Sequence, residues 1–355
     1  MTTEVNREAP ARAVRSSAGT ARRVSVGRRS AMLLISVVLL ALSCAASIAI
    51  GSREVPLEQV WSAITGGDVD QATRTAIVDL RVTRTLIGLL VGAGLAVAGA
   101  IIQSVTRNPL ADPGILGVTS GSSFAVALAV ALLGVTDPLG YVWFAFAGAA
   151  ATTVLVYALG SGRGGPNPLR LTLAGMAFGA VLSGVIAAIR FSDPERFNAL
   201  LVWESGSFQL RTLATTLPVA PFVVAGIVLA LALGRSLNAL ALGDDLAHSL
   251  GSSVARTRVL SIVAITLLAG GATAIAGPIA FVGLMVPHLA RAMVGQDQRW
   301  IMGLSVLLGP SLVLIADVLG RVALRPGELP VGIVTAFIGA PVLVALARRR
   351  KVSGL

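Results

Sequence analysis

Residues 259–287 read VLSIVAITLLAGGATAIAGPIAFVGLMVP, 29 residues without a charge. One helix of this length would reach about 44 Å at about 1.5 Å per residue, whereas the hydrocarbon core of a membrane is about 30 Å thick. Gly277 and Pro278 stand near the middle, and proline removes a helical hydrogen-bond donor and clashes with the preceding turn. We therefore predict two membrane-spanning helices here, the second continuing to about Gly295.

Eight further apolar runs bring the predicted number of spans to ten. The chain has 355 residues, 55% of them hydrophobic and 13% charged, with a mean hydropathy of +0.85. Soluble proteins carry about 25% charged residues, so this composition excludes a soluble enzyme and, despite a net charge of +11, a nucleic-acid binder. Because so many spans follow, we interpret the first run as a retained span rather than a signal peptide. The runs are residues 31–50, 86–105, 114–135, 141–160, 171–189, 213–234, 301–316 and 331–347.

The basic residues indicate the orientation, since arginine and lysine favour cytoplasmic loops. The N-terminal tail holds seven arginines and the chain ends in Arg348, Arg349, Arg350 and Lys351. Both tails should therefore be cytoplasmic, which requires an even number of spans; with ten, 19 of the 28 basic residues lie inside. The prediction is an all-α polytopic membrane protein, a ten-helix bundle with both termini cytoplasmic. Residues 1–30 form a basic tail expected to be disordered, 31–347 the transmembrane domain and 348–355 a basic C-terminal tail.

The spans are rich in glycine and alanine, as at Gly88, Gly92, Gly94 and Gly99. Small residues let helix backbones approach closely in a membrane, so we expect a tightly packed bundle. The sequence has no phosphate-binding glycine loop and no cysteine pair near its two histidines, so no ATP or metal site is predicted. One alternative is a secondary transporter that works alone, with Asp317 as its proton site; an embedded enzyme would need converging polar residues that the sequence lacks.

The longest predicted cytoplasmic loop, residues 235–258, contains ALALGDDLAHSLG at residues 239–251. Asp244 and Asp245 favour a helix N-terminus, Leu246 and Leu250 share one face, and Gly251 can end the helix in a left-handed conformation. A short amphipathic helix outside the bilayer needs a cover for its apolar face. We predict docking to a cytoplasmic partner; the alternative is a helix lying on the lipid surface.

Several segments in order resemble the FecCD-type permease family, the membrane subunits of ABC importers for ferric siderophores, haem and cobalamin. The resemblance runs from about Val55 to Arg350 and implies ten spans with both termini cytoplasmic. Besides the loop just described, it rests on LRVTRTL (80–86), TRNPLADPG (106–114), AGPIAFVGL (276–284), PHLAR (287–291), ELPVG (328–332) and GAP (339–341).

The resemblance implies two docking surfaces. On the cytoplasmic side, the coupling helix would sit in a groove of an ATPase subunit through Leu242, Gly243, Asp244, Asp245, Leu246, Ala247, Leu250 and Gly251. On the outer side, Arg81, Arg84 and Arg321 would engage glutamates of a substrate-binding protein, for which a forked guanidinium is well suited; contact with lipid headgroups is the alternative. Thr83 stands where the family usually has proline.

An inner mouth or gate is expected at Arg107, Asn108, Pro109 and Asp112, and at Pro168 and Leu169. The last two replace the small hydroxyl residues of the family, so the gate chemistry does not transfer. The implied assembly, in the plasma (inner) membrane, contains a second permease subunit (an identical copy or a close paralogue), two ATPase subunits and the substrate-binding protein. This chain would be non-catalytic and bind no cofactor, with ATP and Mg used by the ATPases. The cargo would be a ferric siderophore, with cobalamin or haem as alternatives, and the pathway wall is expected to be largely apolar and inert.

Overall fold

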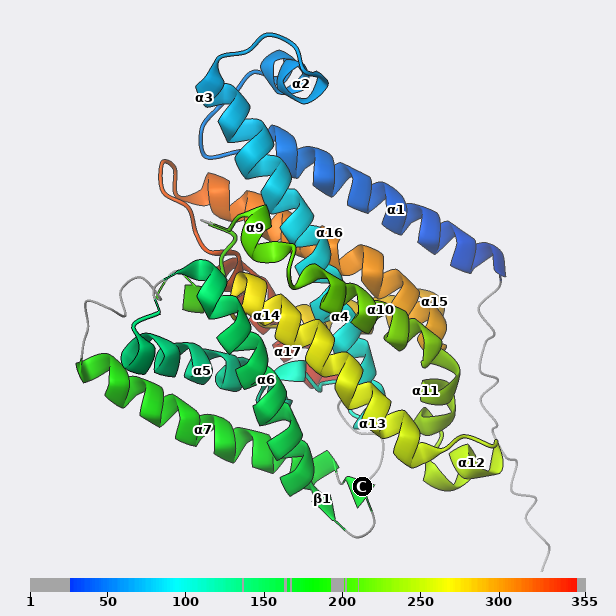
Figure 1. Ribbon diagram of the computed structural model, residues 1–355. Coiled ribbons are helices and arrows are strands. Elements are labelled where there is room, and N and C mark those ends of the chain that lie inside the picture. Colours follow the sequence, from blue (N-terminus) through cyan, green and yellow to red (C-terminus); the bar gives the residue numbers. More distant parts are fainter. Residues whose placement is uncertain are drawn as a thin grey trace, which may run out of the picture.

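A computed structural model describes residues 26–135, 137–162, 165–166, 168–192, 201, 203–209 and 211–349. The predictions for residues 1–25 and 350–355 lie outside these ranges. The described chain is helical apart from a two-stranded antiparallel hairpin, β1 (Ser161–Gly162) and β2 (Gly165–Pro166) (Figure 1). Its helices are α1 (Val26–Ala49), α2 (Leu57–Thr65), α3 (Gln71–Arg74), η1 (Thr75–Val82), α4 (Thr83–Val105), η2 (Pro113–Leu116), α5 (Val118–Leu133), α6 (Pro138–Gly160), α7 (Pro168–Ser192), α9 (Leu213–Thr216), α10 (Ala220–Ala232), α11 (Gly234–Ala241), α12 (Asp244–Ser249), α13 (Val254–Ile265), η3 (Thr266–Gly270), α14 (Gly271–Ala276), α15 (Val282–Val294), α16 (Gln298–Ala323) and α17 (Val331–Arg349).

Among the described residues, six helices are long and apolar enough to cross a membrane. A seventh candidate is the pair α10 and α11, which is bent by 56° at its junction. Three shorter apolar helices lie in α5, α15 and the first part of α17. These segments coincide with the ten expected spans, although α1 begins at Val26, five residues before the expected start. The number of spans and the side on which the termini lie stay predictions.

The break in the uncharged stretch 259–287 is confirmed. One continuous helix ends with α14 at Ala276, and α15 begins only at Val282. Gly277 has φ +76°, a conformation that favours glycine, and a Cβ there would collide with the carbonyl oxygen of Trp203. The segment from Trp203 fills the gap, since Ser207 N–H donates to Ala276 O at 2.9 Å.

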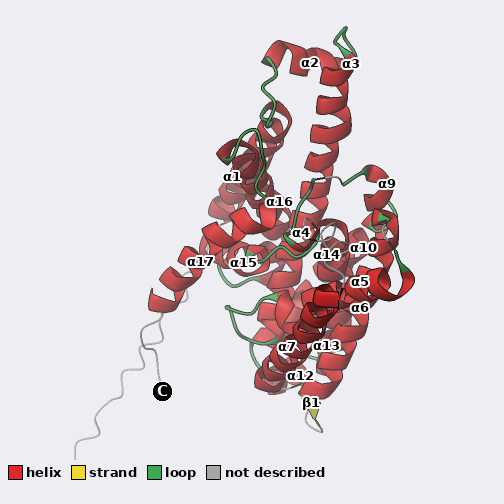
Figure 2. Cartoon of the chain, turned by 90° about the vertical axis from the view of Figure 1, so that its left-hand side faces the viewer, coloured by secondary structure: helices red, strands yellow, loops and turns green. Residues whose placement is uncertain are grey.

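Helix α4 runs through the centre of the bundle (Figures 1 and 2), and most of its span is buried inside the chain. The glycines of this helix are where neighbouring backbones come closest. A Cβ at Gly92 would lie 2.6 Å from Cα of Pro310 in α16, and one at Gly99 would collide with the carbonyl of Gly283 in α15. The predicted close approach at small residues is therefore confirmed.

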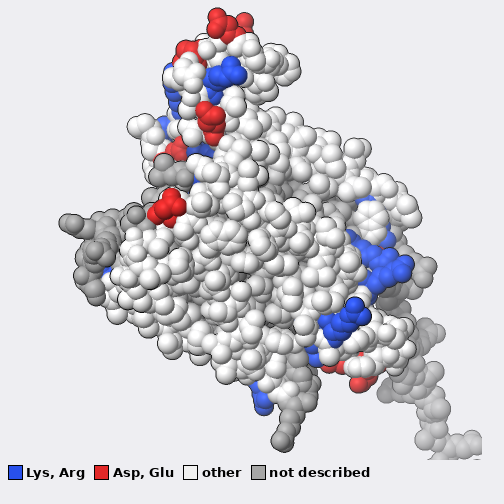
Figure 3. Space-filling view, viewed as in Figure 1, with Lys and Arg blue, Asp and Glu red and all other residues white. Residues whose placement is uncertain are grey.

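Charged side chains gather mainly at two ends of the molecule, with a wide uncharged surface between them on the face seen in Figure 3. One end carries α2 and α3; the other carries α11, α12 and the start of α1 (Figure 1). At the second end, Arg29 lies 3.9 Å from Asp297, and Asn238 donates to that carboxylate at 2.9 Å. An uncharged belt between two charged ends suits a bilayer.

Candidate functional site

Helix α12 carries a row of exposed leucines at the end of the bundle where α1 begins. Leu242, Leu246 and Leu250 are 62%, 55% and 64% exposed, while Ala247, next to Leu246 in the helix, is buried. Leu246 and Leu250, four residues apart, lie on one face, and Leu242 precedes the helix beyond Gly243. The amphipathic helix predicted from the sequence is confirmed, and its apolar face is uncovered.

Both ends of α12 are shaped by glycine. Gly243, just before the helix, has φ +120°, and Gly251, just after it, has φ +77°. The N–H of Gly251 donates to His248 O and that of Ser252 to Ala247 O, both at 2.9 Å. This pair of bonds satisfies the last carbonyls of the helix, and the predicted role of Gly251 is confirmed.

Asp244 ties α12 to two other helices. Arg258 of α13 donates from Nη2 to both carboxylate oxygens of Asp244, at 3.1 and 2.9 Å. Arg107, at the end of α4, forms an ion pair with the same carboxylate and donates from Nε to Leu240 O at 3.1 Å. Within the described chain, the neighbouring side chain of Asp245 has no partner. One carboxylate therefore joins α12 to α13 and to the turn that follows α4.

The turn after α4 follows its predicted chemistry. Asn108 Oδ1 accepts from Leu110 N–H at 3.0 Å, and Asp112 Oδ1 accepts from Gly114 N–H at 2.9 Å. Such side-chain turns replace helical bonds where proline forbids them. The turn leads from Arg107 through η2 to α5, so it connects the Asp244 contacts with the wall of the cavity described below.

The other predicted mouth residues are Pro109, which follows α4, and Pro168 and Leu169 at the start of α7. Pro109 lines a small cavity with Gln103 and Arg291, and Arg291 donates to Gln103 Oε1 at 3.2 Å. Leu169, near the start of α7, is 67% exposed, and the side chain of Pro168 lies outside the described residues. The gate that these residues are predicted to form stays a prediction.

At the opposite end, Arg81 and Arg321 are buried, at 5% and 1% exposure. Arg81 donates from Nη1 to Ile48 O and Ala49 O at 3.0 and 2.8 Å, and Arg321 donates from Nη1 to Ile50 O at 2.9 Å. The last carbonyls of a helix lack partners within it and carry a partial negative charge. Arg81 therefore holds the C-terminus of α1 against η1, which leads directly into α4, and Arg321 holds it against α16.

Two carboxylates complete this arginine cluster, which consists of Arg81, Arg84, Arg321, Asp317 and Glu328. Asp317, at 1% exposure, pairs with Arg84 at 3.0 Å and with Arg321 at 2.6 Å. Arg84 also pairs with Glu328 at 2.8 Å. Burial alone would raise the pKa of Glu328, but Arg84 and hydrogen bonds to its carboxylate bring that pKa below its usual range. Sequence reasoning missed the partnership, although Asp317 and Arg321 have the i, i+4 spacing of a helical ion pair.

The free guanidinium groups that outer docking requires are not found in the described conformation. Arg81 and Arg321 donate to backbone carbonyls of this chain. The side chain of Arg84 is only 13% exposed and pairs with Asp317 and Glu328. Docking of a partner protein to Arg81, Arg84 and Arg321 stays a prediction, and it would require their hydrogen bonds and ion pairs within this chain to break. The exposed arginines beside the cluster are Arg53 and Arg325, and Arg325 pairs with the exposed Glu54.

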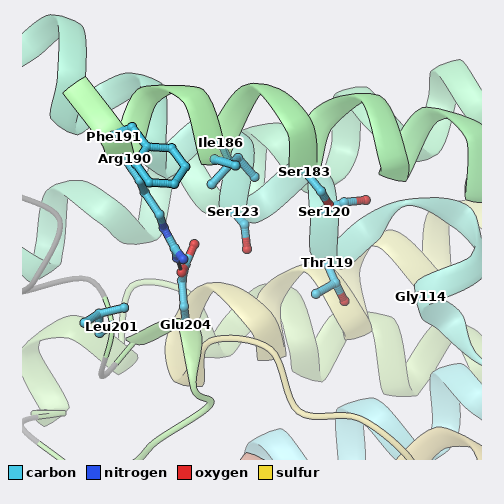
Figure 4. Close-up of a pocket in the computed structure, with 11 residues that line it drawn as sticks. Gly114, Thr119, Ser120, Ser123, Ser183, Ile186, Arg190, Phe191, Leu201 and Glu204 are labelled. Atoms are coloured by element: carbon cyan, nitrogen blue, oxygen red, sulfur yellow. Dashed lines mark ion pairs between the residues drawn. The ribbon is translucent and has the colours of Figure 1, made fainter. Parts of the chain in front are cut away.

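A cavity of about 720 Å³ lies between α5 and α7 (Figure 4). At one end Arg190 of α7 reaches across to form an ion pair with Glu204. A second cavity of about 830 Å³ shares Gly114, Thr119 and Glu204 with the first and extends along α17. Most of the lining of both cavities is apolar, as expected of a pathway wall, although four hydroxyls line the first: Thr119, Ser120 and Ser123 from α5 and Ser183 from α7.

Comparisons with known proteins agree with one another. The sequence matches the FecCD transport family over residues 39–349. It is 48% identical over 320 residues to the ferric enterobactin transport system permease protein FepD of Escherichia coli, covering 90% of this chain and 95% of that protein. It is 34% identical to the hemin transport system permease protein HmuU of Yersinia pestis, covering 90% and 95%.

A solved structure described as an inward-facing conformation of a metal-chelate type ABC transporter is 29% identical. The TM-score is 0.78, over 90% of this chain and 99% of that chain. Sequence and fold similarity thus extend over nearly the whole described bundle. The chain belongs to the FecCD transport family and is a multi-pass membrane permease of that family.

Proposed function

We propose that this chain is the membrane subunit of an ATP-driven importer that moves a ferric siderophore across the plasma membrane into the cytoplasm. Its relatives include permeases for ferric enterobactin, iron(3+)-hydroxamate and hemin, so haem and, from the family resemblance, cobalamin are alternative cargoes. The chain itself is non-catalytic and holds no cofactor. Two separate ATPase subunits use ATP and Mg, and a substrate-binding protein delivers the cargo from outside.

The uncovered leucine row on α12 carries this proposal. The three exposed leucines in and beside this solvent-facing helix need an apolar groove to cover them, and the ATPase subunit supplies it. Asp244 passes the motion of α12 to α4 and α13, so nucleotide-driven movement of the ATPase reaches the bundle. Access to the pathway then alternates between the two sides of the membrane.

A second permease subunit completes the pathway. Helices α7 and α17, which line the two cavities, also expose large apolar side chains, among them Leu173, Met176 and Phe337. An identical copy or a close paralogue packed against these helices encloses the cavities between the two bundles. The cavities then form part of the route taken by the cargo.

The ion pairs of Asp317 count against a proton-driven secondary transporter. A proton site must lose and regain its proton during each cycle. Asp317 instead accepts from Arg84 at Oδ1 and from Arg321 at Oδ2, so both oxygens of its carboxylate are engaged within the chain. Its place in the arginine cluster fits a structural ion pair.

Replacing Leu246 and Leu250 together by glutamate should abolish co-purification of the ATPase and ATP-driven uptake, because two charges would face an apolar groove. The control is Leu57→Glu, which changes a 71% exposed leucine on α2 at the other end of the molecule and should leave ATPase association intact. Pull-down from detergent-solubilised membranes measures both. Retained ATPase and full uptake in the double variant would refute coupling through α12.

For outer docking, we propose the exposed Arg53 and Arg325 as the accessible contacts of the substrate-binding protein. Reversing both to glutamate should weaken its binding to the permease complex by about ten-fold, because rim charges steer and orient partners. The same charge change at the opposite end, Arg256→Glu with Arg299→Glu, is the control. Binding is measured in nanodiscs at two salt concentrations. Equal affinity in the two double variants would exclude this surface.

A further inference from the structure

The hydroxyl groups of the α5–α7 cavity differ from most others in the helices. Serine and threonine within a helix commonly donate to the carbonyl four residues earlier, as Ser36, Ser43, Ser104, Thr153, Ser261 and Ser305 do here. In contrast, within the described chain the hydroxyls of Thr119, Ser123 and Ser183 make no hydrogen bond, although all three line the cavity. Their donors and acceptors are available to whatever occupies it.

The arrangement of these groups selects for an occupant with oxygen acceptors. Thr119 and Ser123 lie one turn apart on α5, and Ser183 faces them from α7 (Figure 4). Each hydroxyl offers one donor. The nearby positive charge, Arg190, is balanced by Glu204, so the cavity attracts anionic oxygens through neutral donors rather than through a net charge. Such contacts hold a ligand loosely enough for it to leave.

The size of the cavity suits a small chelate. Its volume of about 720 Å³ falls within the range of about 300–1,000 Å³ usual for small-molecule sites. A siderophore that binds iron through catecholate, hydroxamate or carboxylate groups carries acceptor oxygens around the metal. Haem and cobalamin also carry anionic oxygens, in the propionates of haem and the phosphodiester of cobalamin. These oxygens are few and lie at the edge of a large apolar or amide-covered surface, so both compounds gain less from three donors.

We propose that Thr119, Ser123 and Ser183 form a transient contact site for the anionic oxygens of an oxygen-ligated ferric chelate within the transport pathway. This inference rests on the proposed function and narrows its cargo to siderophores. Ser120 lines the same cavity but already donates to Gly117 O at 3.3 Å, so its hydroxyl contributes less.

The test compares a triple variant with a neighbouring control. Thr119→Val, Ser123→Ala and Ser183→Ala remove the three hydroxyls and nearly preserve side-chain volume. The control is Ser122→Ala, which removes the hydroxyl next to Ser123 that is fully buried and donates to Ala145 O of α6 at 2.9 Å. The permease–ATPase complex in nanodiscs, without binding protein, is titrated with radiolabelled ferric enterobactin, haem and cobalamin.

The expected result is about a ten-fold rise in the Kd for ferric enterobactin in the triple variant, with the control unchanged and haem and cobalamin little affected. An unchanged Kd for ferric enterobactin would overturn the inference, as would an equal loss for all three compounds, which would indicate a general effect on the cavity. ATP-driven uptake by the complete wild-type system is measured in parallel. If the wild type transports none of the three compounds, the proposed function fails; if it transports ferric enterobactin while the triple variant binds it normally, only this inference fails.

Discussion

Replacing Asp317 by asparagine is expected to lower the free energy of unfolding by about 3–5 kcal/mol, because removing one partner of a buried ion pair leaves an uncompensated charge. Asp317 is 1% exposed and forms ion pairs with both Arg84 and Arg321. Arg321 also holds the C-terminus of α1 through Ile50 O. The variant should therefore loosen the contact between α1, α4 and α16, and thermal unfolding in detergent measures the loss.

Glu54→Gln is the matched control for this prediction. Glu54 also pairs with an arginine, Arg325, but its side chain is 83% exposed, so removing the charge should cost at most about 1 kcal/mol. Equal melting temperatures for the two variants would show that the arginine cluster does not hold this end of the bundle together. Normal folding of Asp317→Asn, combined with uptake that has become insensitive to a proton gradient, would revive the proton-site interpretation.

The parts of the structure that follow local rules could be predicted from the sequence. The break at Gly277 depends on a glycine conformation and on the adjacent Pro278, both visible in the chain itself. The end of α12 at Gly251 and the shared face of Leu246 and Leu250 likewise depend on spacings of a few residues. Close packing at Gly92 was predictable as a tendency, although its partner Pro310 was not.

The partners of Arg81, Arg84 and Arg321 could not be predicted in the same way. Arg84 and Asp317 are 233 residues apart, and Arg321 bonds to Ser47 O across 274 residues. Charge counting predicts the side of the membrane on which an arginine lies, but it does not show whether a distant carboxylate of the same chain forms an ion pair with it. The exposure of these arginines, and hence their availability to another protein, depends on the tertiary fold.

The cavity hydroxyls illustrate the same limit. Thr119 and Ser123 are visible in the sequence as two polar residues of an apolar span. Ser122 is equally visible, yet it is fully buried and donates to α6. Which of these hydroxyls faces open space depends on where α6 and α7 pack around α5, and only the structure contains that information.

Asp244→Lys is expected to reduce ATP-driven uptake by about ten-fold or more while the ATPase still co-purifies, because a like charge would then face Arg107 and Arg258 where charge-assisted bonds now hold. The leucine row that contacts the ATPase in our proposal remains intact in this variant. Movement of α12 would no longer be passed to α4, to the turn that follows it, or to α13. Uptake and ATP hydrolysis are measured together in proteoliposomes, and hydrolysis should continue.

Asp245→Lys separates this connection from simpler effects. Asp244 and Asp245 both lie in the first turn of α12, so either substitution places a positive charge at the same helix N-terminus and disturbs the helix dipole equally. Asp245 is exposed and has no side-chain partner among the described residues. A loss of uptake in Asp244→Lys alone would therefore be due to the broken ion pairs with Arg107 and Arg258. Equal losses of uptake in both variants would instead indicate an effect of helix stability or surface charge. The proposal that the ion pairs of Asp244 transmit the movement of α12 would then be wrong.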